Sequence, residues 1–122
     1  MRNSFRFVSV VISTLTLLGV VSVATVNATD ESDIQKGKKI ALHNKKGNCL
    51  ACHMIPDGGE QPGNIGPPLI AMKARFPDKD VLRAQIADPR TKNPNSIMPP
   101  FGAHGILTDK ELDKVTEYIY SL

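Results

Sequence analysis

The sequence predicts a small all-α domain in which three helices are joined by two long loops. Apolar residues recur at helical spacing in three segments, and capping residues or prolines bound each segment. No segment alternates apolar and polar residues as a half-buried strand does, and no internal repeat is present. At 122 residues, the chain has room for one domain.

The chain opens with the pattern of a secretory leader. Two arginines precede an uncharged apolar run over residues 7–26, and small residues at Val26 and Ala28 suit cleavage after Ala28. An uncleaved anchor is the alternative, because about 20 apolar residues can cross a bilayer. We favour cleavage because a polar stretch follows at once. The expectation is a signal peptide at residues 1–28, an exported domain at residues 29–122, and no membrane anchor after cleavage.

The charge of the exported domain is close to neutral. Cleavage removes two of the 15 basic residues and leaves 13 against 12 acidic residues, a net charge of +1. A nucleic-acid-binding domain would carry a basic stripe with interleaved aromatic residues. Here aromatic residues make up 5% of the chain and tryptophan is absent. We therefore expect no nucleic-acid partner.

The first helix is expected over residues 33–44, with Asp33 as its N-cap. Ile34, Gly37 and Ala41 share one narrow face of this helix. A glycine on that face allows the close approach of another helix.

The second helix is expected over residues 78–87. Pro77 precedes it and Pro89 follows it, at positions where proline commonly bounds a helix. Its apolar stripe is wide, so its borders are the main support for this element.

The third helix begins at Thr108, because "TDKE" is a capping box in which Thr108 and Glu111 can bond each other's backbone amides. Tyr118 lies at the edge of the apolar arc that follows. The arc is formed by Leu112, Val115, Ile119 and Leu122. We expect the first and third helices to cross, with Gly37 admitting Val115 or Tyr118.

Two irregular stretches, residues 55–69 and 88–105, are rich in proline and glycine. Loops of this length are unusual in a compact domain unless they have a function. We expect both loops to pack against a third part of the molecule and not against each other.

"GNCLACH", residues 47–53, holds the only two cysteines of the chain. C-x-x-C-H is the attachment signature of c-type haem, in which Cys49 and Cys52 add to the vinyl groups and His53 ligates the iron. A haem at the centre of the domain would also enlarge the apolar core of so small a chain. We expect the chain without haem to be largely unfolded.

Three other interpretations of the cysteine pair fit the sequence less well. A redox dithiol is typical of a βαβ pattern, which is missing here. A structural zinc site would need His43 or His104 as a fourth ligand. A disulfide would leave His53 and the long loops unexplained, so haem is favoured.

A haem iron held by His53 needs a ligand on its opposite face. The candidates are Met54, Met72, Met98, His43 and His104. Met98 is favoured because Pro99 and Pro100 stiffen the segment that would present its sulfur; His104 is the main alternative. With both axial positions filled the chemistry is one-electron transfer, and a methionine ligand raises the reduction potential relative to two histidines.

His53 is expected to donate its second ring N–H to an acceptor, as metal-bound histidines usually do. The carbonyl of Pro67, in "GPPL", is the favoured acceptor. The alternative is that Pro67 and Pro68 form only a rigid turn.

These motifs resemble class I cytochromes c: an N-terminal helix, C-x-x-C-H, a "GP-x-L" loop, a late methionine beside proline, and a C-terminal helix with a tyrosine. The finer resemblance is to the X subunit of the Sox (sulfur-oxidising) system and covers nearly all the exported domain. It rests on "GNCLACH", "PGNIGPPL", "LRAQIADPR", "NPNSIMPPFG" and "ILTDKELDKVTEYI".

The resemblance implies a periplasmic monohaem cytochrome that forms a heterodimer with a second cytochrome, the A subunit. That pair is an L-cysteine S-thiosulfotransferase, which oxidatively joins thiosulfate to a cysteine of the Sox Y/Z carrier. The A subunit holds the catalytic haem. The X subunit is not catalytic alone and passes electrons to a downstream cytochrome. Carried over, Cys49 and Cys52 bind haem c, and His53 and Met98 ligate its iron.

The chain departs from this family in one place. Only "GAHG" separates Phe101 from Ile106, where many members have a longer insertion. Partner contacts built from that segment are therefore in doubt.

Two alternative functions remain open. Five lysines between residues 36 and 46 could form the docking patch of a freely diffusing electron shuttle, although a solvated helix face is the favoured interpretation. A haem sensor or peroxidase-like protein would instead need an open or displaceable sixth ligand.

Overall fold

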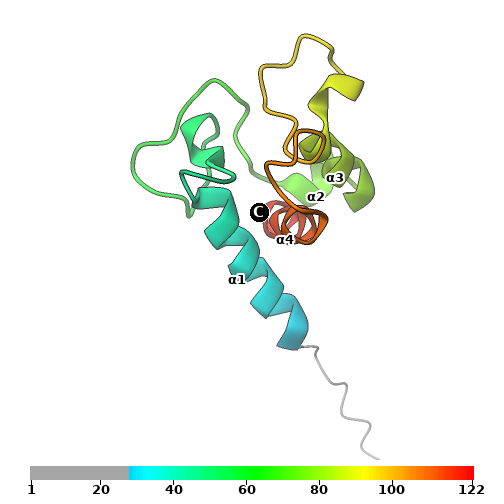
Figure 1. Ribbon diagram of the computed structural model, residues 1–122. Coiled ribbons are helices and arrows are strands. Elements are labelled where there is room, and N and C mark those ends of the chain that lie inside the picture. Colours follow the sequence, from blue (N-terminus) through cyan, green and yellow to red (C-terminus); the bar gives the residue numbers. More distant parts are fainter. Residues whose placement is uncertain (1–27) are drawn as a thin grey trace, which may run out of the picture.

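The computed structural model describes residues 28–122, and Figure 1 shows these residues as a ribbon. Within this range the regular structure is entirely helical, so the all-α expectation is confirmed. The α-helices are α1 (Ala28–Leu42), α2 (Met72–Arg75), α3 (Lys79–Ala87) and α4 (Asp109–Tyr120), and the short 3₁₀ helices are η1 (Cys49–Ala51) and η2 (Pro89–Thr91). No helix of residues 28–122 has both the length and the apolar character that crossing a bilayer requires.

Helices α1 and α4 cross in close contact at Gly37 (Figure 1). A Cβ atom on Gly37 would lie 1.9 Å from the carbonyl oxygen of Lys114 and 3.0 Å from the Cβ of Tyr118. The expected crossing is therefore present, with Tyr118 and the backbone at Lys114 as the neighbours of the glycine. A larger side chain at position 37 would force the helices apart.

The prediction for the first helix was wrong at both ends. The helix begins at Ala28, so Asp33 lies inside it and is not the N-cap. The Asp33 carboxylate instead accepts a hydrogen bond from Lys114 Nζ at 2.9 Å, an interaction between helices that local sequence does not reveal. The helix ends at Leu42, before Asn44. The predicted leader lies outside the described residues except for Ala28.

The other two predicted helices are present: the second begins one residue later than expected, with Asp78 as its N-cap, and the third has the predicted capping box. The Asp78 side chain accepts from the amide of Asp80 at 2.8 Å at the start of α3. At the start of α4, Thr108 Oγ1 accepts from the amide of Glu111 at 3.3 Å, and Glu111 Oε2 accepts from the amide of Thr108 at 3.0 Å. Arg83 then joins the helices, because its Nε donates to Asp113 at 2.6 Å.

The core lies where α1, α3 and α4 meet the two long loops. Its buried apolar side chains include Ala41, Ile55, Met72, Leu82, Ile86, Phe101, Leu107, Leu112, Val115, Tyr118 and Ile119. The predicted arc of α4 supplies Leu112, Val115 and Ile119. Both loops contribute as well, through Ile55 and Phe101, so they are part of the packed domain.

Candidate functional site

A cavity of about 750 Å³ opens between η1, the two long loops and helices α2, α3 and α4. Its apolar lining includes Leu69, Met72, Phe76, Leu82, Ile86, Phe101, Val115 and Ile119. The volume is within the range of ordinary cofactor and ligand sites. The long loops thus pack around a shared space.

Both cysteines line this cavity from η1. They are half-buried and not joined to each other by a disulfide. Burial raises the pKa of the Cys49 thiol to about 11, so this sulfur stays protonated at neutral pH. A reactive dithiol would need a lowered pKa. The raised pKa of Cys49 therefore argues against the redox-dithiol interpretation.

His53 lies on the cavity wall with its ring held in one orientation. Its Nδ1 lies 2.7 Å from the carbonyl oxygen of Pro67. A carbonyl oxygen can only accept, so Nδ1 carries the hydrogen and Nε2 keeps its lone pair. The predicted contact between His53 and Pro67 is thus present. It leaves Nε2 as the nitrogen able to bind a metal.

Gly66 provides the space for this ring. A Cβ atom at position 66 would lie 2.3 Å from His53 Cε1 and 2.6 Å from His53 Nδ1. The amide of Gly66 also donates to the Cys52 carbonyl at 2.8 Å, which ties the Pro67 turn to the cysteine segment. Sequence reasoning missed this role, although Gly66 is the first residue of "GPPL".

Met98 lines the same cavity from the second long loop and is half-buried. Its amide donates to Ser96 Oγ at 3.3 Å, and Pro100 behind it is buried. The structure therefore brings Met98 to the cavity that also holds Cys49, Cys52 and His53.

The competing candidate ligands have other contacts. His104 Nε2 lies 3.3 Å from Arg90 Nη1, and His43 Nδ1 accepts from the amide of Lys45 at 3.1 Å. Neither histidine lines the cavity. Met72 does line it, but is buried, and its sulfur accepts from Arg75 at 3.4 Å. Within residues 28–122 no group of three or more His, Cys, Asp or Glu side chains gathers as a metal cluster, which argues against zinc.

Sequence reasoning overlooked the Asp57 carboxylate, which links the first long loop to two helices. Asp57 accepts from the Tyr118 hydroxyl at 2.6 Å and from Lys38 Nζ at 2.7 Å, joining the first loop to α4 and α1. Burial acts against its charge, but the hydrogen bonds from Lys38 and Tyr118 still hold the pKa of Asp57 below its ordinary value. Only the three-dimensional fold brings these residues together.

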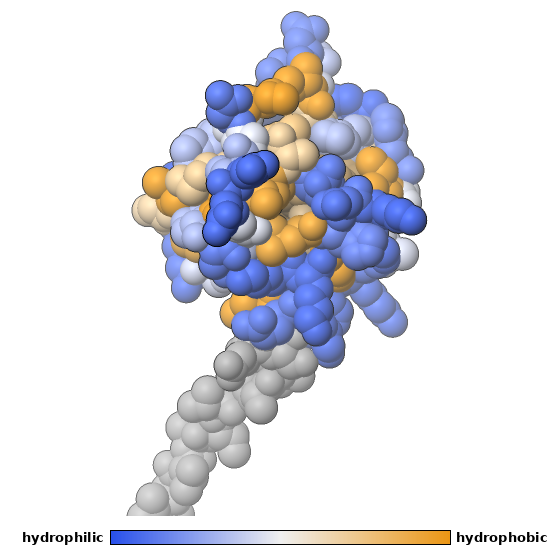
Figure 2. Space-filling view, turned by 90° about the vertical axis from the view of Figure 1, so that its left-hand side faces the viewer, coloured by the Kyte–Doolittle hydropathy of each residue, from blue (hydrophilic) through white to orange (hydrophobic). Residues whose placement is uncertain are grey.

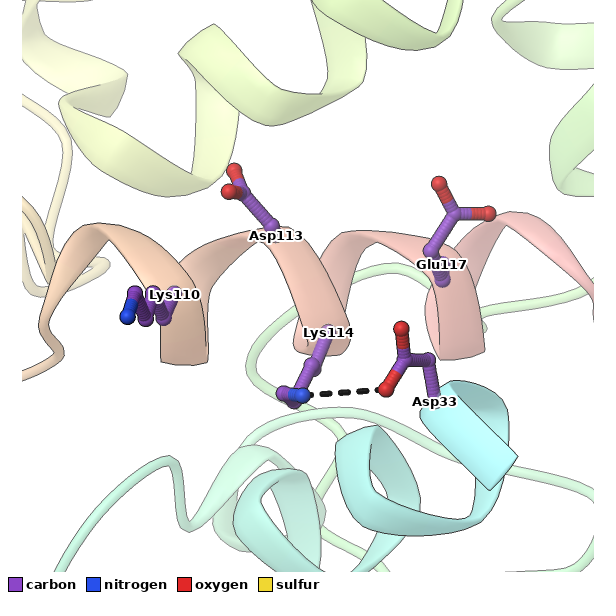
Figure 3. A pocket seen from close by; sticks show the side chains of 5 residues that line it. All are labelled: Asp33, Lys110, Asp113, Lys114 and Glu117. Carbon is purple, nitrogen blue, oxygen red and sulfur yellow. Dashed lines mark hydrogen bonds and ion pairs between the residues drawn. The ribbon is translucent and has the colours of Figure 1, made fainter. Parts of the chain in front are cut away.

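A second, shallower hollow of about 240 Å³ lies along α1 and α4 (Figure 3). All of its lining residues are charged: Asp33, Lys110, Asp113, Lys114 and Glu117. The hydrogen bond between Lys114 and Asp33 spans it, so it is a solvated ion-paired surface, separate from the cysteine site.

Residues 32–119 match the family described as "Cytochrome C oxidase, cbb3-type, subunit III". The chain belongs to this cytochrome c family. A curated relative, described as "Uncharacterized lipoprotein" of Aquifex aeolicus (strain VF5), is 36% identical over 101 residues. That match covers 72% of this chain and 49% of the relative, so the chain spans about half the relative's length.

As a cytochrome c domain the chain carries one haem c, bound covalently through Cys49 and Cys52. The cavity fits this group in its volume and apolar lining. It also presents both thiols and an oriented imidazole on the same wall. The cofactor predicted from C-x-x-C-H is confirmed. The match to the cytochrome c family also confirms the expected cytochrome fold.

Proposed function

We propose that this cytochrome is a one-electron carrier in which His53 Nε2 and the Met98 sulfur would hold the haem iron. The main support is the hydrogen bond from His53 Nδ1 to the carbonyl oxygen of Pro67, which fixes the tautomer that leaves Nε2 available to bind iron. The bound haem supplies a reversible one-electron change at iron. The chain orients the imidazole and offers a thioether from the second long loop.

The test is the substitution Met98→Ala. Loss of a thioether ligand should lower the reduction potential and let added cyanide or carbon monoxide bind, because methionine ligation favours the reduced iron. The matched control is Met54→Ala, which changes a methionine that does not line the cavity. An unchanged spectrum and potential in Met98→Ala would overturn the assignment.

We further propose that its electrons come from a partner cytochrome of the Sox A type, in a heterodimer that joins thiosulfate to a cysteine of the Sox Y/Z carrier. The support is sequence resemblance: "GNCLACH", "PGNIGPPL" and "NPNSIMPPFG" follow one another in the order of the X subunit. In this proposal the present chain accepts electrons and hands them to a downstream cytochrome, without catalysing the transfer of sulfur alone.

Size-exclusion chromatography of a native extract tests this pairing, with an antibody against this chain and haem absorbance as detectors. Co-elution with a second haem protein, well above the size of this chain, is expected, together with thiosulfate-dependent reduction of its haem. Elution as a lone small cytochrome that thiosulfate does not reduce would favour the free electron shuttle.

We propose a periplasmic location. The predicted leader supports it, and so does a relative whose description is a lipoprotein, a class of exported proteins. Fractionation should place the haem-bearing chain in the periplasmic extract. Recovery with membranes after a high-salt wash would instead favour the uncleaved anchor.

A further inference from the structure

Three polar side chains, Tyr118, Asp57 and Lys38, form a row that runs from the core to the surface. The Tyr118 hydroxyl donates to Asp57 Oδ1 at 2.6 Å, and Lys38 Nζ donates to Asp57 Oδ2 at 2.7 Å. Tyr118 is 2% exposed, whereas the side chains of Asp57 and Lys38 are 47% and 31% exposed. The carboxylate therefore lies between a buried hydroxyl and a surface ammonium, with one oxygen bonded to each.

This polar row lies against the segment that attaches the haem. A Cβ atom on Gly58, the residue after Asp57, would lie 2.8 Å from Leu50 Cδ1, and Leu50 directly follows Cys49. Burial and the Asp57 carboxylate raise the pKa of Tyr118, and the Cys49 sulfur adds to this rise. The inner end of the row is therefore within electrostatic range of a haem-attachment thiol.

The ion pair in this row has a defined orientation. Lys38 belongs to α1 and Asp57 to the first long loop, which form the side of the molecule that faces the viewer in Figure 2, where hydrophilic residues dominate. The carboxylate is bonded inward to the buried Tyr118, so the negative end of the pair points towards the core and the positive end towards water. Because the energy between charges falls with distance, the nearer carboxylate outweighs the farther ammonium at the haem.

We propose that the Asp57 carboxylate lowers the reduction potential of the haem and that Lys38 limits this effect. Oxidised haem iron carries one more positive charge than reduced iron, so a negative charge nearby stabilises the oxidised form. The inference rests on the proposed function, since the reduction potential sets the direction of electron flow in an electron carrier.

The alternative is a purely mechanical role, in which the row only ties the first loop to α1 and α4. Breaking such a tie would loosen the packing and admit water, and water favours the more highly charged, oxidised haem. A mechanical role therefore predicts a lower potential for every variant that disrupts the row. The electrostatic role predicts shifts of opposite sign when the carboxylate and the ammonium are removed in turn.

The test is a spectroelectrochemical titration of the holoprotein at neutral pH and low ionic strength. Asp57→Asn removes the charge but keeps an oxygen that accepts from Tyr118, so the potential should rise. Lys38→Gln leaves the carboxylate without its counter-ion, so the potential should fall. Both shifts should shrink in about 1 M salt, where screening of exposed charges acts over about 3 Å.

A second ion pair on the same helices supplies the matched controls. Lys114 Nζ donates to Asp33 at 2.9 Å in the charged hollow of Figure 3, and the two side chains are as exposed as those of Lys38 and Asp57. Asp33 lies nearer the start of α1, away from the cysteine segment that follows the helix. Asp33→Asn and Lys114→Gln should therefore loosen the contact between α1 and α4, measured by urea unfolding, and leave the potential unchanged.

A lowered or unchanged potential in Asp57→Asn would overturn the proposal, and so would a raised or unchanged potential in Lys38→Gln. Equal shifts in Asp33→Asn and Asp57→Asn would overturn it as well. If urea unfolding shows that Asp57→Asn does not fold, the surface variant Lys38→Gln still decides the sign. A wild-type haem that cannot be reversibly reduced contradicts the carrier function itself, while reversible reduction with unshifted potentials contradicts only the role of Asp57.

Discussion

The two sides of the haem cavity are held in different ways. On the histidine side, backbone bonds run from Gly66 to Cys52 and from Leu69 to Met54, and Pro67 orients His53. On the methionine side, the segment around Met98 is bonded mainly within itself, for example from the Met98 amide to Ser96. In the folded protein, backbone hydrogen bonds between separate segments thus fix the histidine side.

The methionine loop is anchored at its ends. The amides of Gly102 and Ala103 both donate to the Ala87 carbonyl at the end of α3, at 3.0 and 3.1 Å. Before this loop, the Asp88 side chain caps η2 and binds the Arg90 guanidinium at 2.8 Å. Between these anchors, Met98 and its neighbours line the cavity. From this comparison we expect that the protein can lose the proposed methionine ligand, Met98, while its fold survives.

Loss of the haem is expected to have the largest effect. Cys49→Ala combined with Cys52→Ala removes both covalent attachments and leaves a cavity of about 750 Å³ inside a domain whose core surrounds it. Net stabilities of domains are only about 5–15 kcal/mol. Circular dichroism during heating should then show no cooperative transition. A sharp transition in this variant would show that the chain folds without haem.

A change on the histidine side should come next. Gly66→Ala drives a Cβ atom into the His53 ring and should cost about 1–3 kcal/mol, as overpacking does. It should also alter the haem absorption spectrum. Gly105→Ala is the control, because its φ of +63° strains an alanine while nothing lies within 4 Å. The control should lower the free energy of unfolding with no spectral change; if both variants keep the wild-type spectrum, the tight fit at His53 is refuted.

Lowering the pH should weaken the ion pair between Lys46, just before the cysteine segment, and Glu111 of α4. The ion pair with Lys46 and the amide of Thr108 lower the pKa of Glu111 to about 2. A carboxyl whose pKa is lowered by folding stabilises the folded state above its ordinary pKa of 4.5, and this contribution disappears as the pH falls through about 2. Urea unfolding from pH 6 to pH 2 should show a steeper loss for the wild type than for Glu111→Gln. Parallel curves would exclude this link.

The smallest expected effect is an increase in the free energy of unfolding. Ala71 holds a left-handed conformation, φ 50° and ψ 40°, immediately before α2. Such a conformation costs a non-glycine residue roughly 1–2 kcal/mol. Ala71→Gly should therefore raise the free energy of unfolding by up to about 1 kcal/mol, measured in urea. A lower value would mean that the strain is absent.

Local patterns predicted the parts of this protein that depend on neighbouring residues. The capping box at Thr108 and the start of α3 after Asp78 are examples, and both are present. C-x-x-C-H predicted the cofactor because its spacing lets two thiols add to the vinyl groups of haem while the adjacent histidine ligates the iron. The contact between His53 and Pro67 was also expected, since a metal-bound imidazole needs an acceptor and a stiff loop lies nearby.

Features set by distant residues escaped sequence reasoning. The start of α1 depends on residues before Asp33, whose carboxylate is committed to Lys114, 81 positions away. The short helix α2 follows Ala71, which has a left-handed conformation that alanine seldom adopts. Residue propensities therefore would not have predicted where this helix begins. Two of the five lysines between residues 36 and 46 form ion pairs, Lys38 with Asp57 and Lys46 with Glu111. These pairs weaken the case for a docking patch formed by the five lysines.

The identity of the methionine ligand is the central claim, and one NMR spectrum tests it most directly. The reduced holoprotein would be labelled at the methionine methyl groups and compared with Met98→Leu and Met72→Leu. A methyl group bound beside the haem face experiences the ring current and shifts far upfield. We predict that the upfield methyl signal disappears in Met98→Leu and persists in Met72→Leu. Persistence in Met98→Leu, or its loss in Met72→Leu, would contradict the account.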